Sequence, residues 1–164
     1  MATNTYVALD KVTVGTATPS ITFSSIPSTY TDLYIVVDGL SSSSGGNTLS
    51  MVFNSDANSA YSATRVQGNG TSATSARVTS DPTIAIIGDT NRTNVLISVQ
   101  NYSNTTTYKT SLARYNNTSS GDPRVGAYVQ LRSSTTAITS ITFSIPSANI
   151  VAGSTFSLYA IKSE

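Results

Sequence analysis

Hydrophobic and polar residues alternate along most of this chain. The alternation is clearest in four segments, Asp32–Asp38, Leu49–Asn54, Asn94–Gln100 and Arg124–Arg132. A period of two predicts β-strands with one buried face. The buried face is expected to carry the apolar set, which in the last segment consists of Val125, Ala127, Val129 and Leu131.

Turn signals separate the alternating segments, and no stretch shows the spacing of an amphipathic helix. The turns include the glycine-rich run at 41–47, QGNG at 67–70 and NNTSSGDP at 116–123. Gly and Asn tolerate positive φ, and Pro presets a turn angle. The pattern predicts an all-β fold, a single-domain antiparallel β-sandwich of jelly-roll type with about eight to eleven strands. This domain is expected to span residues 1–164, with residues 1–6 as a possible N-terminal arm.

One phrase occurs twice, as ITFSSIPS at Ile21–Ser28 and as ITFSIPS at Ile141–Ser147. Each copy predicts a half-buried strand that ends at a proline corner, and each is followed by a strand containing Leu-Tyr. A jelly roll is a long hairpin rolled into two sheets, so its first and last strand pairs lie side by side. We therefore expect the two units to pack together. Chance similarity between strands rich in Ser and Thr and duplication of an ancestral unit both explain the repeat, and the sequence leaves both open.

Composition excludes several kinds of site. The chain has no Cys and no His, so disulfides, thiolate chemistry and Ser-His-Asp catalysis are excluded. Its formal net charge is +1 and only 10% of residues are charged, which disfavours a nucleic-acid partner. No apolar run is long enough to span a membrane, and MATNTYVALD does not resemble a signal peptide. No enzymatic activity, cofactor or metal is predicted.

Candidate contact residues come from the tyrosines and their polar neighbours. Tyrosine rings stack on sugars and are enriched at protein interfaces. The candidates for glycan or partner contact are Tyr61, Arg65, Asn69, Tyr102 and Tyr108. For each tyrosine, packing within the fold is the competing explanation.

A calcium site would need clustered oxygen ligands. The candidate carboxylates, which separate loops would have to bring together, are Asp81, Asp89 and Asp122. Their position in turns makes a turn-forming role the favoured interpretation.

Four stretches carry a resemblance to a family of short virion structural proteins of tailed phages, common in marine and cyanobacterial phages. They are ITFSSIPSTYTDLYIVVDG (Ile21–Gly39), YSATRVQGNGTSATSAR (Tyr61–Arg77), YKTSLARYNN (Tyr108–Asn117) and ITSITFSIPSANIVAGSTFSLYAIK (Ile138–Lys162). The chain departs from the family pattern at Ala160, where Gly is more common. The resemblance implies a β-sandwich on the phage particle.

Three functions are consistent with the resemblance and the composition. The first is a capsid decoration or cement protein on the particle exterior, acting through subunit contacts as a homotrimer bound to the major capsid protein. The second is a tail fibre or spike head that binds host-surface glycan. The third, outside the virion, is a free carbohydrate-binding module. The expected location is the virion, after synthesis in the host cytoplasm.

Overall fold

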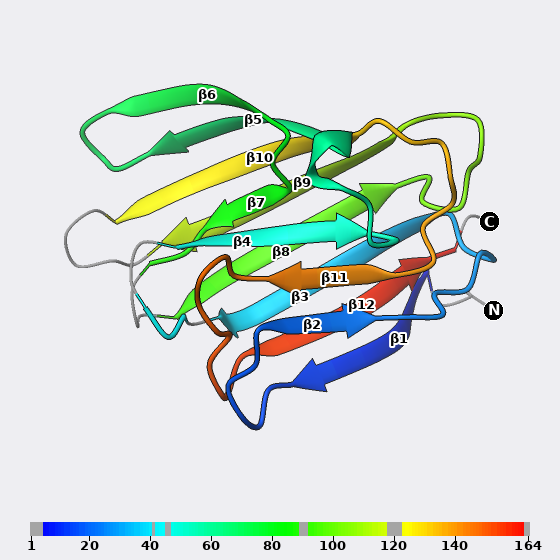
Figure 1. The fold of residues 1–164 in the computed structure, drawn as a ribbon, viewed down its shortest axis with the longest axis horizontal. Coiled ribbons are helices and arrows are strands. Elements are labelled where there is room, and N and C mark those ends of the chain that lie inside the picture. The colour runs from blue at the N-terminus through cyan, green and yellow to red at the C-terminus, as the bar shows by residue number, and fades with distance from the viewer. Residues whose placement is uncertain (1–4, 41, 45–46, 89–91, 118–122, 163–164) are drawn as a thin grey trace.

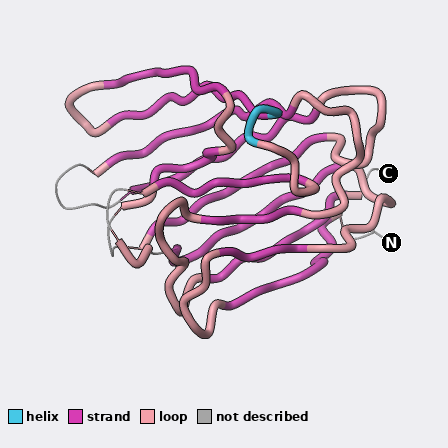
Figure 2. The backbone as a smooth tube through the Cα atoms, viewed as in Figure 1, coloured by secondary structure: helices cyan, strands magenta, loops and turns pink. Residues whose placement is uncertain are grey.

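The protein is built from two antiparallel sheets that pack face to face (Figure 1, Figure 2). The computed structural model describes residues 5–40, 42–44, 47–88, 92–117 and 123–162. In sheet order, the large sheet holds β1 (Tyr6–Thr13), β12 (Thr155–Ile161), β3 (Asp32–Leu40), β8 (Thr93–Gln100), β9 (Lys109–Asn117), β10 (Arg124–Arg132), β5 (Tyr61–Gly68) and β6 (Ala73–Thr79). The small sheet holds β2 (Ser20–Phe23), β11 (Ile141–Ser144), β4 (Thr48–Phe53) and β7 (Thr83–Ile86), and a short 3₁₀ turn, η1 (Asn58–Ala60), precedes β5.

The predicted β-sandwich is confirmed. The described residues form twelve strands, one more than the upper end of the predicted eight to eleven. The strands pair as a nested series, β5 with β6, β4 with β7, β3 with β8 and β2 with β11, which is the pairing of a long hairpin rolled into a jelly roll. The additional strands widen the large sheet: the β9–β10 hairpin lies between β8 and β5, while β1 and β12 extend the sheet beyond β3.

The two copies of the repeated phrase lie side by side, as predicted. In the small sheet β2 pairs with β11 so that Thr22 faces Thr142, and their hydroxyl oxygens are 2.9 Å apart. In the large sheet β3 pairs with β12 so that Tyr34 faces Tyr159. Each unit thus places one strand in each sheet.

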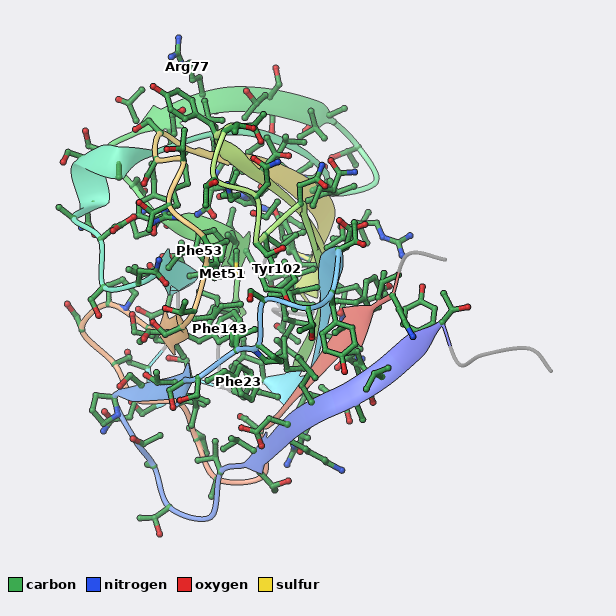
Figure 3. The ribbon with its side chains drawn as sticks, turned by 90° about the vertical axis from the view of Figure 1, so that its right-hand side faces the viewer. Phe23, Met51, Phe53, Arg77, Tyr102 and Phe143 are labelled. Carbon is green, nitrogen blue, oxygen red and sulfur yellow. The ribbon has the colours of Figure 1, made fainter. Side chains whose placement is uncertain are left out.

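The core lies between the sheets and is dominated by aromatic and β-branched side chains. Phe143 on β11 sits between Phe23 on β2 and Phe156 on β12, with ring centroids 6.3 and 5.2 Å away. Figure 3 shows Phe23, Phe143, Met51 and Phe53 gathered in this layer. Aromatic pairs of this kind stabilise a fold by about 0.5–1.5 kcal/mol beyond the area they bury.

One predicted strand has the opposite face buried. In β10 the apolar residues point to solvent, and Val125 and Val129 are 66% and 52% exposed. The alternating set, which includes Tyr128, Gln130 and Arg132, is buried instead. The prediction for this strand was wrong because its buried polar side chains all find partners inside, as described below.

Thr5 and Tyr6, the last two residues of the predicted N-terminal arm, lie against the C-terminal end of β12. Tyr6 already belongs to β1 and faces Ile161 of β12, and the Lys162 N–H donates to the Thr5 carbonyl over 3.1 Å. The Tyr6 ring meets the Tyr34 ring edge to face, at 6.1 Å between centroids. The rest of the predicted arm, residues 1–4, lies outside the described residues.

Candidate functional site

Two of the predicted contact residues are core residues. Tyr61 is 2% exposed, and its hydroxyl oxygen accepts the Phe53 N–H at 2.7 Å. Tyr102 is fully buried and donates its hydroxyl to the Pro27 carbonyl. Burial raises the pKa of both phenols. Neither ring is available to stack on a sugar or a partner, so packing explains both tyrosines.

The other three candidates are separate from one another. Arg65 lies on β5 with its guanidinium 6.0 Å from the centroid of the Tyr128 ring. Asn69 closes the β5–β6 turn, where its side-chain oxygen accepts the backbone N–H groups of Thr71 and Ser72. Tyr108 is 56% exposed just before β9. The described structure therefore does not bring the five predicted residues together as one site.

Of the three carboxylates considered for a calcium site, the described residues include only Asp81. Asp81 accepts the backbone N–H and hydroxyl of Thr83, which is a turn-forming role. Asp89 and Asp122 lie outside the described residues. Among the described residues there is no group of three potential metal ligands. The described part of the chain also contains no helix with the length and hydropathy of a membrane span.

A buried polar cluster fixes the inner faces of β9 and β10. Arg132 is 1% exposed and forms an ion pair with Asp56 at 2.5 Å. Its neighbour Lys109 is fully buried, and its ammonium group donates to three backbone carbonyls. Burial, and then the charge of Arg132, lower the pKa of Lys109. Gln130 donates to the Pro82 carbonyl at 2.9 Å, which ties β10 to the strand that begins after Pro82.

Because those polar groups face inward, an apolar surface faces outward. Five exposed aliphatic side chains on β5, β9 and β10 share the outer side of the large sheet. Their strand pairing confirms the common face: Leu112 is opposite Val129, and Val66 is opposite Ala127. We call this surface the outer patch; its members are Val66, Leu112, Val125, Val129 and Leu131, between 37% and 66% exposed.

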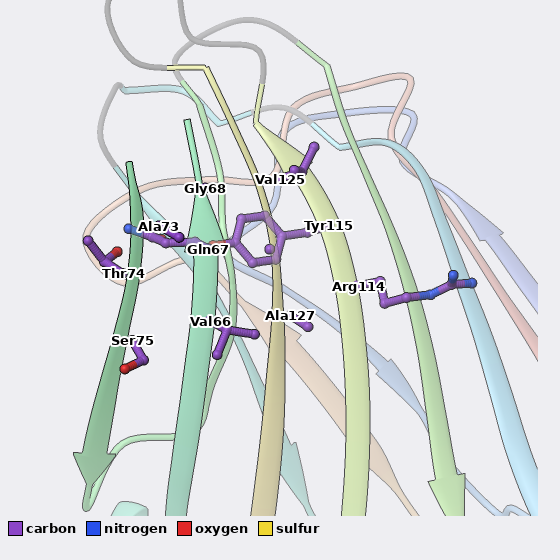
Figure 4. A pocket seen from close by; sticks show the side chains of 11 residues that line it. Val66, Gln67, Gly68, Ala73, Thr74, Ser75, Arg114, Tyr115, Val125 and Ala127 are labelled. Atoms are coloured by element: carbon purple, nitrogen blue, oxygen red, sulfur yellow. The ribbon is translucent and has the colours of Figure 1, made fainter. Parts of the chain in front are cut away.

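A hollow of about 670 Å³ adjoins one end of the outer patch, where Val66 and Val125 are the two patch residues that line it. Side chains and backbone of four adjacent strands line it, as Figure 4 shows. The small side chain of Ala127 lies between Val66 and Arg114 in one cross-strand row, with Val125 two residues away on the same strand. A methyl group flanked by larger side chains leaves the depression, whose lining also includes the polar residues Gln67, Thr74, Ser75, Arg114 and Tyr115.

Comparison with known proteins adds no family. No family model matches the chain, and no curated protein matches it significantly in sequence. Two solved structures of Scytalido-glutamic peptidase, both with transition-state analogues, are 11% and 13% identical; they cover 92% and 87% of this chain and 72% and 73% of the peptidase chain, with TM-scores of 0.26 and 0.27. An aerolysin-like protein of Bombina maxima is 9% identical, with 93% and 90% coverage and a TM-score of 0.14. Scores this low support no inference about fold or function.

The outer patch was missed because its strands were expected to bury those residues. A signal was present in β10, where Arg132 and Gln130 alternate with the apolar residues. Either phase of a period-two pattern makes a regular strand, and burying this polar set requires partners from distant segments. Those partners, such as Asp56 and the Pro82 carbonyl, are not recognisable from local sequence.

Proposed function

We propose that this protein is a non-catalytic structural protein of a tailed-phage virion, on the particle exterior, that docks onto another virion protein through the outer patch. The single observation that carries the proposal is the outer patch itself. Large exposed apolar patches mark interaction surfaces, and five aliphatic side chains on three adjacent strands form such a patch.

The surrounding chemistry favours a protein partner. The outer patch lies on the outer face of the large sheet, and one cation, Arg114, lines the adjoining hollow. Apolar side chains with a flanking arginine are typical of the centre of a protein interface. The low overall charge of the chain, +1, also suits a subunit held in an assembly.

The phage particle is proposed because the sequence resembles virion structural proteins of tailed phages. The major capsid protein is the proposed partner. A homotrimer remains the predicted oligomer. A fibre head that binds host glycan is the competing proposal, but its candidate residues Tyr61 and Tyr102 are buried.

The first experiment locates the protein on purified particles with gold-labelled antibody and electron microscopy. We expect label over the head. Label at the tail tip, together with binding of the recombinant protein to a glycan array, would replace the proposal with the fibre-head function. Particles without label would overturn both virion functions.

The second experiment tests the outer patch on shells stripped of the protein. Val129→Glu places a charge at the centre of the outer patch and is expected to weaken rebinding about tenfold or more, because the charge is desolvated on docking. Ala8→Glu is the matched control, since Ala8 is exposed on β1 at the far edge of the same sheet. Equal rebinding of the two variants would contradict a role for the outer patch.

A further inference from the structure

The two sheets have four open edges, and three of them carry features that prevent pairing with another strand. Natural edge strands are protected by shortness, prolines, charges or bulges. In the large sheet, β1 has a bulge between Ala8 and Asp10 and carries Asp10 and Lys11 in succession. In the small sheet, β2 and β7 each have four residues, and each directly follows a proline, Pro19 and Pro82 respectively.

The fourth edge, β6, is the least protected of the four. It runs for seven residues, Ala73–Thr79, and pairs with β5 in continuous register without a bulge. It contains no proline and one charged residue, Arg77, which points away from the body of the molecule in Figure 3. Figure 1 shows β6 at the rim of the large sheet. Its open side is therefore a template for another strand.

The hydrogen-bond phase of β6 shows which residues face the open side. At the two ends of the β5–β6 hairpin, the Asn69 N–H donates to the Ser72 carbonyl at 3.2 Å and the Ser80 N–H donates to the Tyr61 carbonyl at 2.8 Å. Because hydrogen-bonded pairs alternate along an antiparallel ladder, the even-numbered residues of β6 bond to β5. The backbone N–H and C=O groups of the odd-numbered residues point outward; these are Ala73, Ser75, Arg77 and Thr79.

We propose that β6 pairs antiparallel with β6 of a second copy of this chain, across a two-fold axis at Ala76. In this register Ser75 and Arg77 of each copy form hydrogen-bonded pairs with Arg77 and Ser75 of the other, and Ala73 pairs with Thr79. Every outward backbone group of the strand then has a partner. The large sheets of the two copies join into one continuous sheet. This contact goes beyond the proposed function and does not depend on it.

The side chains fit this register. Ala76 meets its own copy at a position without hydrogen bonds, where antiparallel Cα atoms approach to about 4.5 Å, and a methyl group fits there. Each Arg77 faces a serine, so no like charges are opposed on the added pair. An identical strand supplies the matching pattern of donors and acceptors. A pairing of one strand is small for an interface, so we expect a weak dimer with a dissociation constant on the order of micromolar.

Single-cysteine cross-linking tests the register, because the chain has no cysteine of its own. Ala76→Cys is expected to form a disulfide-linked dimer under mild oxidation, since the two Cβ atoms lie about 4.5–5.5 Å apart. Ala73→Cys is the matched control on the same strand, and its two copies are about 20 Å apart in this register. Equal cross-linking of both variants, or none for Ala76→Cys at about 100 times the expected dissociation constant, would overturn the proposal.

A second variant tests the edge hydrogen bonds. Proline is tolerated on an edge strand where its missing N–H faces solvent, which is the case for Ser75. Adding Ser75→Pro to Ala76→Cys is expected to abolish cross-linking while thermal unfolding shows a folded chain. Undiminished cross-linking would contradict edge pairing.

If Ser75→Pro fails to fold, charge substitutions at the same exposed position test the β6–β6 register instead. Ser75→Asp faces Arg77 of the other copy and is expected to raise the dimer fraction several-fold. Ser75→Lys places two cations opposite each other and is expected to lower it. The same dimer fraction for both, by analytical ultracentrifugation, would rule out the register. Rebinding to stripped shells is a separate readout, so failure of this dimer and failure of the proposed function are distinguishable.

Discussion

At the scale of single residues, buried tyrosine hydroxyls form hydrogen bonds that link separate segments of this protein. Tyr61 joins β5 to β4 through the Phe53 backbone, and Tyr102 reaches the proline corner at Pro27. The Tyr115 hydroxyl donates to the side-chain oxygen of Gln67 at 3.0 Å. A buried phenol supplies apolar area and one hydrogen bond, which suits a sandwich without tryptophan.

These buried phenols make stability sensitive to alkaline pH. Burial raises the pKa of both Tyr61 and Tyr115 to about 12, from 10.0. Below pH 10 their contribution is fully present. Above pH 10 the unfolded chain loses these protons first, so stability falls as pH rises toward 12. The free energy of unfolding is expected to decrease by up to about 1.4 kcal/mol per pH unit for each tyrosine.

Urea unfolding between pH 9 and 12, with tyrosinate absorbance as a second signal, measures this loss. Tyr61→Phe is the control. It is expected to cost about 1 kcal/mol at neutral pH, for the hydrogen bond to the Phe53 N–H, and to reduce the alkaline slope. A free energy of unfolding that stays constant up to pH 12 would contradict the assignment.

At the scale of elements, strand ends are held by side chains that bind the backbone of other segments. Asn54 follows β4 with a φ of 52°, in the left-handed region. Its side-chain oxygen accepts the N–H groups of Thr139 and Ser140 at 2.8 and 3.1 Å, and its amide donates to the Ala137 carbonyl at 2.7 Å. One residue thereby fixes the segment that leads into β11.

Replacing Asn54 tests this link between elements. Asn54→Ala removes four side-chain hydrogen bonds, three of them to backbone, and leaves a left-handed backbone that alanine disfavours, so we expect a loss of roughly 3 kcal/mol in the free energy of unfolding. Asn54→Gly removes the same hydrogen bonds but tolerates the backbone, and is expected to retain about 1 kcal/mol more. Chemical denaturation of both variants gives the comparison. Losses below about 0.5 kcal/mol for both would show that other contacts hold the segment.

At the scale of the whole molecule, the two sheets differ in width. The small sheet covers part of the inner face of the large one, and Figure 1 shows β5 and β6 extending past it. The outer patch and the open edge both lie at this end of the large sheet. The end of the sandwich farthest from β1 thus concentrates the surfaces available for assembly.

Despite this unequal cover, we expect one cooperative unfolding transition. The central strands β3, β8 and β9 join both ends of the large sheet through continuous pairing. Calorimetry should give a single peak with an enthalpy of about 115 kcal/mol for 164 residues, equal to the van 't Hoff value. Two resolved peaks would show instead that the β5–β6 end unfolds on its own.

Much of the fold was predictable because it depends on local pattern. The segment Arg124–Arg132 was predicted with the bounds of β10, and the repeated ITFS phrase was correctly expected to pair with its second copy. The candidate site was not predictable to the same degree. Tyr61 and Tyr108 look alike in sequence, yet one is 2% and the other 56% exposed.

The sequence by itself determined that the chain is all-β, where most strands lie, and that its two similar units meet. Alternation and turn residues determine the local backbone through residues that are close in sequence. Strands and turns can therefore be predicted without a structure. Only the tertiary structure decided which face of β10 is buried, which tyrosines are buried and hydrogen-bonded to other segments, and that β6 is an open edge. A period-two pattern is compatible with burial of either face of the strand. Which face is buried depends on partners such as Asp56, which pairs with Arg132 from 76 residues away in sequence.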